Sequence, residues 1–236
     1  MSTETLIKPN SPLDQLRRRD AAAAQSVPAG LSPQARADLA AVLAQPVDYV
    51  DDELFYARDA EQRIFEPEDV EIPEPNTSWY HPVMESASSS RDVRGVVNVV
   101  LNKHQERALF LQYNYARHRL SEAREAVGDG EGDRAQADEI LRWYRTSREL
   151  RDRIAQFNLA LVLAMAKRVR GTDLDFADLI SEGNMALLRA IDKFNVSKGF
   201  KFSTYACRAI LKAFSRTGMK HTQYKNMFPT DFDPAL

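Results

Sequence analysis

The stretch KGFKFSTYACRAILKAFSR, from Lys198 to Arg216, mixes aromatic rings with basic side chains. Its first half places Phe200, Phe202 and Tyr205 among lysines. Aromatic side chains normally pack in a core, whereas lysines normally face water. The mixture therefore indicates either a half-buried structural segment or a binding surface for a partner that has flat rings and negative charge.

The second half of this stretch has the periodicity of an amphipathic helix. Small and apolar residues share one face, while Arg208, Lys212 and Arg216 follow each other at intervals of four on the other. Ser203 or Thr204 is predicted to cap the start of this helix. A continuous row of positive charge is unfavourable by itself, so the row favours a contact with phosphates.

Two further helical patterns precede this one. The nearer pattern, DFADLISEGNMALLRAIDKF, covers residues 175–194 and carries an apolar stripe that includes Phe194, which we expect in the core. Asp175 is a plausible N-cap for it. The earlier pattern runs from about residue 135 to Arg170 and ends at Gly171.

Composition predicts an all-α protein without a membrane segment. The 236 residues include 44% hydrophobic side chains, enough for a core, and only 9 glycines, which favours helices over turn-rich β architecture. Cys207 is the single cysteine, so an internal disulfide is excluded. Because the sequence has no apolar run of bilayer-spanning length and no secretory signal pattern, we expect a cytoplasmic protein with no membrane partner.

Charge is divided along the chain, although the formal net charge is only -2. Residues 1–100 hold 9 Lys or Arg against 17 Asp or Glu, whereas residues 151–228 hold 14 against 6. This asymmetry favours a C-terminal part that binds a polyanion and an acidic N-terminal part, with solvated surface on both as the alternative.

The chain divides into four parts on these patterns. Residues 1–95 are predicted to be an acidic segment, largely disordered with short helices, because proline and acid interrupt its helical patterns. Residues 96–150 carry helical patterns that GDGEGD interrupts. Residues 151–228 form the basic helical domain, and residues 229–236 form a tail.

A longer segment, NLALVLAMAKRVRGTDLDFADLISEGNMALLRAIDKFNVSKGFKFSTYACRAI, runs from Asn158 to Ile210. It resembles region two of the bacterial RNA polymerase sigma factors of the sigma-70 family. DLISEGNMALLRAIDKF and GFKFSTYA occur in that family's order and at its spacing. Upstream, LFLQYNYARHRL is similar to the helix that precedes region two, so residues 96–150 would include this helix and residues 151–228 would be region two.

The resemblance implies a factor that binds core RNA polymerase, recognises the promoter minus-ten element and holds the non-template strand single, with two bases turned out into pockets. It implies no enzyme activity, catalytic residue, metal or cofactor, and the sequence has no phosphate-binding glycine loop, metal signature or nucleophile with a placed base. The positions that match DNA-contacting residues are Lys198, Phe200, Lys201, Phe202, Thr204, Tyr205, Arg208, Lys212, Ser215 and Arg216. The positions that match contacts to a coiled coil of the polymerase clamp are Asp178, Ser181, Glu182, Asn184 and Leu188.

Some of these residues have a structural alternative. Phe202 and Tyr205 could anchor the third helix in the core, but the resemblance favours a DNA contact for both. Asp175, Asp178 and Glu182 could be metal ligands or a solvated acidic face. The solvated face is the stronger alternative, because these residues lack a defined loop or a histidine partner.

The segment departs from the family at several positions. Arg208 and Ala209 stand where the family usually has adjacent tryptophans, and Ala160 stands where it usually has an arginine. The family continues into further helical domains, whereas this chain ends at FPTDFDPAL, which leaves a fragment, a truncated product and a minimal factor open. The alternative functions are a polymerase-binding regulator that does not initiate and a general single-stranded-DNA-binding module.

Overall fold

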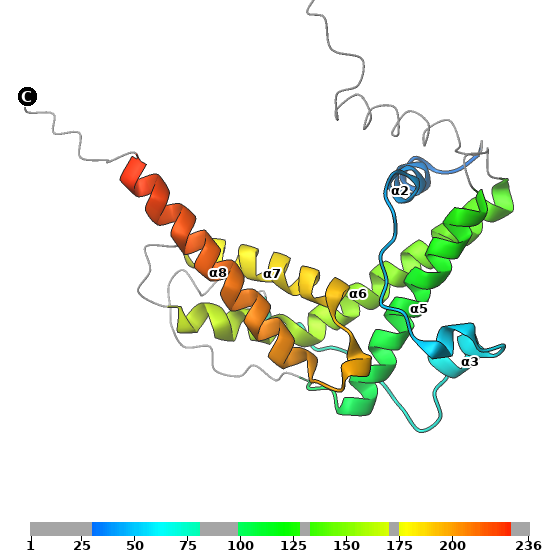
Figure 1. The fold of residues 1–236 in the computed structure, drawn as a ribbon, viewed down its shortest axis with the longest axis horizontal. Helices are drawn as coiled ribbons and strands as arrows, with labels where there is room; N and C mark the ends of the chain where they lie inside the picture. Colours follow the sequence, from blue (N-terminus) through cyan, green and yellow to red (C-terminus); the bar gives the residue numbers. More distant parts are fainter. Residues whose placement is uncertain (1–29, 81–98, 128–132, 170–174, 228–236) are drawn as a thin grey trace, which may run out of the picture. The chain divides into compact units, whose positions relative to one another are not determined.

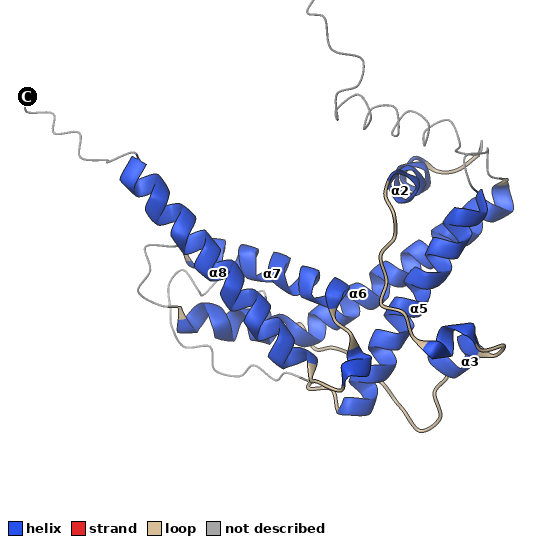
Figure 2. Ribbon diagram, in the orientation of Figure 1, coloured by secondary structure: helices blue, strands red, loops and turns tan. Residues whose placement is uncertain are grey.

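The computed structural model describes residues 30–80, 99–127, 133–169 and 175–227, with only the backbone at 224–226. Every regular element in this part of the chain is helical (Figures 1 and 2). The elements are α2 (Pro33–Ala44), η1 (Glu53–Tyr56), α3 (Ala60–Phe65), α5 (Lys103–Val127), α6 (Arg134–Arg168), α7 (Phe176–Lys193), η2 (Val196–Lys198) and α8 (Phe202–Met227). The predicted all-α fold is therefore confirmed for the described residues. None of the described helices has the length and apolarity needed to cross a bilayer.

The described residues fall into two compact units. Residues 30–51 and 114–148 belong to the first unit, and residues 52–113 and 149–227 belong to the second. Helices α5 and α6 are each divided between the two units, with one part in the first unit and the other part in the second.

In the first unit, α2 is defined by a short-range cap and a buried apolar face. The Ser32 hydroxyl oxygen accepts a hydrogen bond from the backbone N–H three residues later, at 3.2 Å, and Pro33 opens the helix. Leu39 and Val42 are buried. Arg124 on α5 donates to the backbone carbonyl that follows Val42, at 3.3 Å, so a side chain of α5 binds the last turn of α2.

Trp143 joins α5 to α6 in the same unit. Its buried ring meets Tyr115 edge to face, with 5.8 Å between centroids. The guanidinium groups of Arg142 and Arg119 lie 4.7 and 5.5 Å from the ring centroid. Arg119 also pairs with Glu139 across the two helices at 3.2 Å, so one cluster combines stacking with an ion pair.

In the second unit, α7 packs against α8 and the C-terminal part of α6. Asp175 has the extended backbone of an N-cap, as predicted, but its side chain makes no capping hydrogen bond. A Cβ added at Gly183 would lie 2.6 Å from a methyl of Val162 on α6 and 3.1 Å from the ring of Phe214 on α8. Glycine at this position therefore permits the close approach of three helices.

The C-terminal end of α7 is held by a carboxylate. Asp192 accepts two hydrogen bonds from the Arg151 guanidinium, at 2.9 and 2.8 Å, and one from the Tyr113 hydroxyl at 2.7 Å. A bidentate arginine contact is geometrically specific. It fixes the direction in which the chain leaves α7 toward η2 and α8.

The start of α8 differs from the prediction. The helix begins at Phe202, so Ser203 and Thr204 lie inside its first turn and cannot be its N-cap. The backbone N–H of Phe202 instead donates to a carboxylate oxygen of Glu106 on α5, at 2.9 Å. A side chain from a distant helix thus satisfies one of the amide groups that every helix start leaves open.

Part of the predicted acidic segment is ordered on the helices. The Val50 N–H donates to the Asn114 side chain at 2.9 Å within the first unit, and Gln112 donates to the Ile64 carbonyl at 3.1 Å within the second. Residues 1–29, 81–98 and 229–236 lie outside the described residues, so the predicted disorder, the tail and the domain boundaries stay predictions.

Candidate functional site

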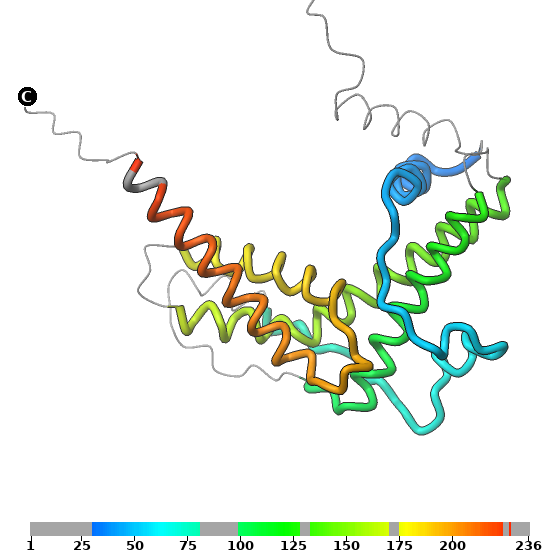
Figure 3. The backbone as a smooth tube through the Cα atoms, viewed as in Figure 1, coloured from blue at the N-terminus to red at the C-terminus, as the bar shows by residue number. Residues whose placement is uncertain are grey.

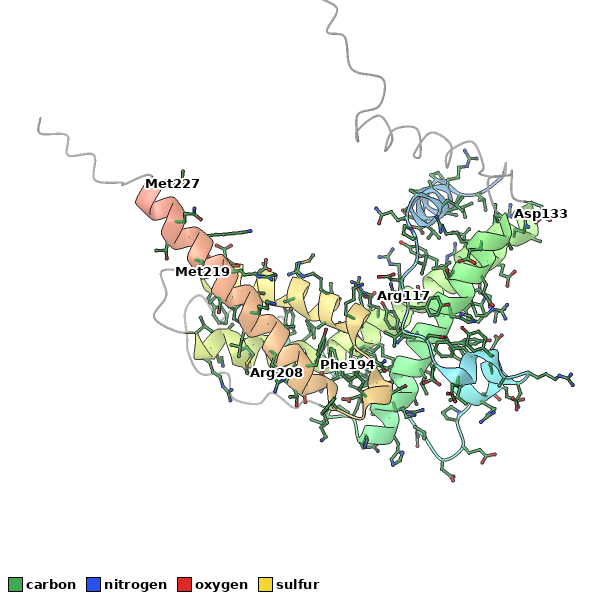
Figure 4. All side chains as sticks on the ribbon, viewed as in Figure 1. Arg117, Asp133, Phe194, Arg208, Met219 and Met227 are labelled. Atoms are coloured by element: carbon green, nitrogen blue, oxygen red, sulfur yellow. The ribbon has the colours of Figure 1, made fainter. Side chains whose placement is uncertain are left out.

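The outer face of α8 presents the basic row that the sequence predicts. Arg208, Lys212 and Arg216 are all exposed, and Tyr205 joins them one turn earlier with 41% of its surface exposed. Thr204 and Ser215 are exposed beside them. At 1.5 Å per residue, the face from Tyr205 to Arg216 extends about 16 Å, enough to follow several nucleotides of a backbone. Figure 4 labels Arg208 on this helix.

The loop before α8 presents an exposed ring between two lysines. Phe200 is 71% exposed, and the flanking Lys198 and Lys201 are also exposed. The loop turns at Gly199, whose φ of 76° is in the left-handed region that favours glycine. The Asn195 side chain accepts from the backbone of the following 3-10 turn at 2.9 Å. The local chain thus holds an apolar ring out of the core.

Phe202 requires a correction, because the resemblance favoured a DNA contact for it. Its ring is 0% exposed and packs against Phe110 at 5.0 Å and Phe194 at 5.1 Å between centroids. A ring with no accessible surface cannot stack on a base in this conformation. Phe194 is buried, as the sequence predicted, and the Tyr205 ring packs against it at a tilt, with 5.6 Å between the ring centroids. The core alternative is therefore right for Phe202, and Tyr205 is both packed and accessible.

Glu106 supports the junction between the loop and α8. Its carboxylate is partly buried, and this desolvation raises its pKa above the ordinary value, although the hydrogen bond from Phe202 and the charge of Lys201 act in the opposite direction. Sequence reasoning missed Glu106, because it lies 96 residues before its partner. Only the pairing of α5 with the start of α8 reveals it.

The second set of candidate residues lies on α7. Asp178 and Ser181 are exposed, whereas Glu182, Asn184 and Leu188 are half-buried. Their spacing places all five within one broad face of the helix. Met185, which sequence reasoning did not single out, adds an exposed apolar side chain beside them.

Two residues of this face are already engaged within the chain. Glu182 accepts a hydrogen bond from Arg189 at 2.8 Å, seven residues along the same helix. Asn184 donates to the hydroxyl of Tyr80 at 3.0 Å. The spacing of two helical turns could have indicated Arg189, but no sequence pattern connects Tyr80 with Asn184.

The described residues contain no group of three His, Cys, Asp or Glu side chains that could hold a metal ion. This finding includes Asp175, Asp178 and Glu182, for which the sequence left a metal site as an alternative.

Comparison with known proteins shows which family these helices are similar to. Residues 154–217, from the C-terminal part of α6 to α8, match the family model for sigma-70 region 2. RNA polymerase sigma factor SigA of Lactococcus lactis subsp. cremoris is 54% identical over 63 residues, which is 27% of this chain and 17% of that protein. SigA of Listeria monocytogenes is 52% identical over 68 residues, which is 29% of this chain and 18% of the relative.

Residues 154–217 therefore correspond to region 2 of the RNA polymerase sigma factors of the sigma-70 family. The resemblance found from the sequence motifs is confirmed by these matches, which cover less than a fifth of the relatives' length.

Proposed function

We propose that the chain acts in transcription initiation, as a factor that binds core RNA polymerase and recognises and melts the promoter minus-ten element. The observation that carries this proposal is the exposure of Phe200 and Tyr205 beside a basic helix face, within the segment that matches sigma-70 region 2. The role requires no catalytic residue or cofactor of its own, and it would place the protein in the cytoplasm.

The two accessible rings would capture bases of the non-template strand. Stacking on an aromatic ring is worth about 1–3 kcal/mol per base, which offsets the cost of a few kcal/mol for taking a base out of the duplex. Phe200 is exposed on the loop, whereas Tyr205 is held by α8 and by its contact with Phe194. Phe202 would not contact a base; its buried ring would fix the junction between the loop and α8.

The basic residues would follow the phosphates. None of these residues forms an ion pair with a described residue, and the set is Lys198, Lys201, Arg208, Lys212 and Arg216. Their charge is available to a polyanion, although Lys201 also acts on the Glu106 carboxylate. Contacts of this kind release counterions, and the resulting affinity falls with added salt. The exposed Thr204 hydroxyl can donate to a phosphate oxygen in addition, whereas the Ser215 hydroxyl already donates to the Leu211 carbonyl at 3.1 Å.

The face of α7 would bind the clamp coiled coil of core polymerase. Its carboxylate, hydroxyl, amide and apolar groups, with Leu188 at one end and Asp178 at the other, fit a helical partner with a polar rim. The ion pair between Glu182 and Arg189 is partly exposed and therefore worth at most about 1 kcal/mol, so a partner cation can replace it.

A second candidate is a regulator that binds polymerase without opening promoters. Arg208 and Ala209 favour this candidate. In the family, the two tryptophans at these positions face the fork, the junction where duplex becomes single strand. Here an exposed charge and a side chain without a ring replace them. A general single-stranded-DNA-binding module would use the same rings and charges without sequence preference.

Abortive transcription by core polymerase, with and without the protein, tests the proposal. A sigma factor should give products on both a duplex and a premelted promoter, and Phe200→Ala and Tyr205→Ala should reduce the duplex signal more. Tyr56→Ala, another exposed aromatic side chain, is the matched control and should change neither.

Products on the premelted promoter alone would favour the regulator. Binding to single strands of any sequence, without products, would favour the general module. No binding to core polymerase would exclude the proposed function.

A further inference from the structure

The chain segment of residues 66–80, called the strap here, runs across the helices of the second unit (Figure 3). It contains five acidic residues and no basic one. Gln105 on α5 donates to the backbone carbonyl of Glu71 at 2.7 Å. The strap is therefore attached first to the N-terminal turn of α5.

Arg153 on α6 binds the middle of the strap. Its guanidinium donates to the carbonyls of Ile72 and Pro73, at 3.2 and 3.0 Å, and to the carboxylate of Glu74 at 2.9 Å. The two backbone acceptors fix the path of the chain. Because the Glu74 side chain is 86% exposed, its ion pair adds little to the attachment.

The end of the strap lies on α7. Trp79 is buried, its indole donates to the carbonyl of Asn76 at 2.8 Å, and its ring meets that of Tyr80 edge to face. The Tyr80 hydroxyl accepts from the Asn184 amide at 3.0 Å. The contact joins residues that are 104 positions apart.

The contact leaves half of the Asn184 amide unsatisfied. Its carbonyl oxygen Oδ1 is buried and has no hydrogen-bond partner among the described residues. A buried acceptor without a donor is destabilising, because it has lost its water without replacement. A partner that offers a donor to Oδ1 would therefore add a hydrogen bond that the docked Tyr80 does not supply.

We propose that residues 71–80 are a displaceable cover on the polymerase-binding face of α7, so that docking of Tyr80 and binding of core polymerase compete for Asn184. This inference rests on the proposed function of that face. Release of Tyr80 exposes both polar atoms of the amide, while the Arg153 anchor keeps the strap close. With Tyr80 docked, the chain would therefore bind polymerase more weakly than a chain whose α7 face is uncovered.

Direct binding of the full chain to core polymerase tests the cover. Tyr80→Phe removes only the hydroxyl, and Tyr80→Ala removes the ring as well. Both should bind about two- to tenfold more tightly than the wild type, the factor expected when one net hydrogen bond no longer competes. Tyr144→Phe, a hydroxyl deletion on the N-terminal part of α6, is the matched control and should leave the affinity unchanged.

Hydrogen exchange of residues 71–80 provides a second measurement, in the free chain and in the complex. The cover predicts faster exchange in the complex. Equal or weaker binding by both Tyr80 variants, or slower exchange in the complex, overturns the inference and makes Tyr80 part of the interface or irrelevant to it. If neither the wild type nor the variants bind polymerase, the proposed function fails and the cover fails with it.

Discussion

Gly183→Ala tests whether α7, the candidate polymerase-binding helix, is positioned by close packing. The added Cβ would lie 2.6 Å from Cγ1 of Val162 and 3.1 Å from the Phe214 ring. Ordinary contacts between carbon atoms are about 3.5–4.0 Å, so a shift of about 1 Å is needed. Val162 is buried in a helix, where its branched side chain has essentially one rotamer, and Phe214 is buried on the other side. The helices themselves must therefore move apart.

Two opposing effects set how much folding stability Gly183→Ala loses. Overpacking a core costs about 1–3 kcal/mol, and the two short contacts favour the upper half of that range. Alanine is a better helix former than glycine by about 1 kcal/mol, which offsets part of the loss. We expect Gly183→Ala to lower the free energy of unfolding by about 1–2 kcal/mol.

Urea unfolding followed by far-ultraviolet circular dichroism measures this difference. Val162→Ala supplies the control, because it removes the methyl group that the new Cβ meets. It should cost less in the Gly183→Ala background than in the wild type, by about 1 kcal/mol or more. If Gly183→Ala is as stable as the wild type, or if the two substitutions are simply additive, the close approach of α6 and α7 is not what requires glycine.

Three further predictions concern the site. Glu182→Lys should weaken core-polymerase binding by about 1.5–3 kcal/mol without unfolding α7, whereas Arg189→Ala should leave binding equal or tighter; unchanged affinity of the Glu182 variant would remove that residue from the interface. Burial raises the pKa of Glu106, so the folded chain holds this proton more tightly than the unfolded chain, and the group's contribution to stability falls as pH rises above the ordinary 4.5. Glu106→Gln keeps an acceptor for α8 and should gain stability relative to the wild type between that pH and neutrality in urea titrations; a constant difference would contradict the assigned burial. Replacing Arg208 and Ala209 by tryptophan should tighten forked-DNA binding by the polymerase complex, by about 1–3 kcal/mol per stacked base, and make its salt dependence shallower; no gain across a salt series would count against a fork-facing position.

Much of the second unit could be predicted from local sequence patterns. The all-α fold, the existence of the α7 and α8 helices and the outward row of Arg208, Lys212 and Arg216 follow from helical periodicity, because residues four apart share a face whatever the helix packs against. Burial of Phe194 followed from its place on the apolar stripe. The match to sigma-70 region 2 could also be predicted from the sequence, because its motifs are contiguous in the chain.

The partners of individual side chains were decided only by the tertiary structure. Phe200 and Phe202 are two residues apart among the same lysines, yet one is exposed and the other is buried against α5. The helix that begins at Phe202 is capped by Glu106, and Asn184 on the candidate polymerase face is bound by Tyr80. Local sequence sets which residues are helical and which way they face. Which of them meet depends on how segments about a hundred residues apart come together, because the hydrogen bonds and ring contacts form between elements rather than within them.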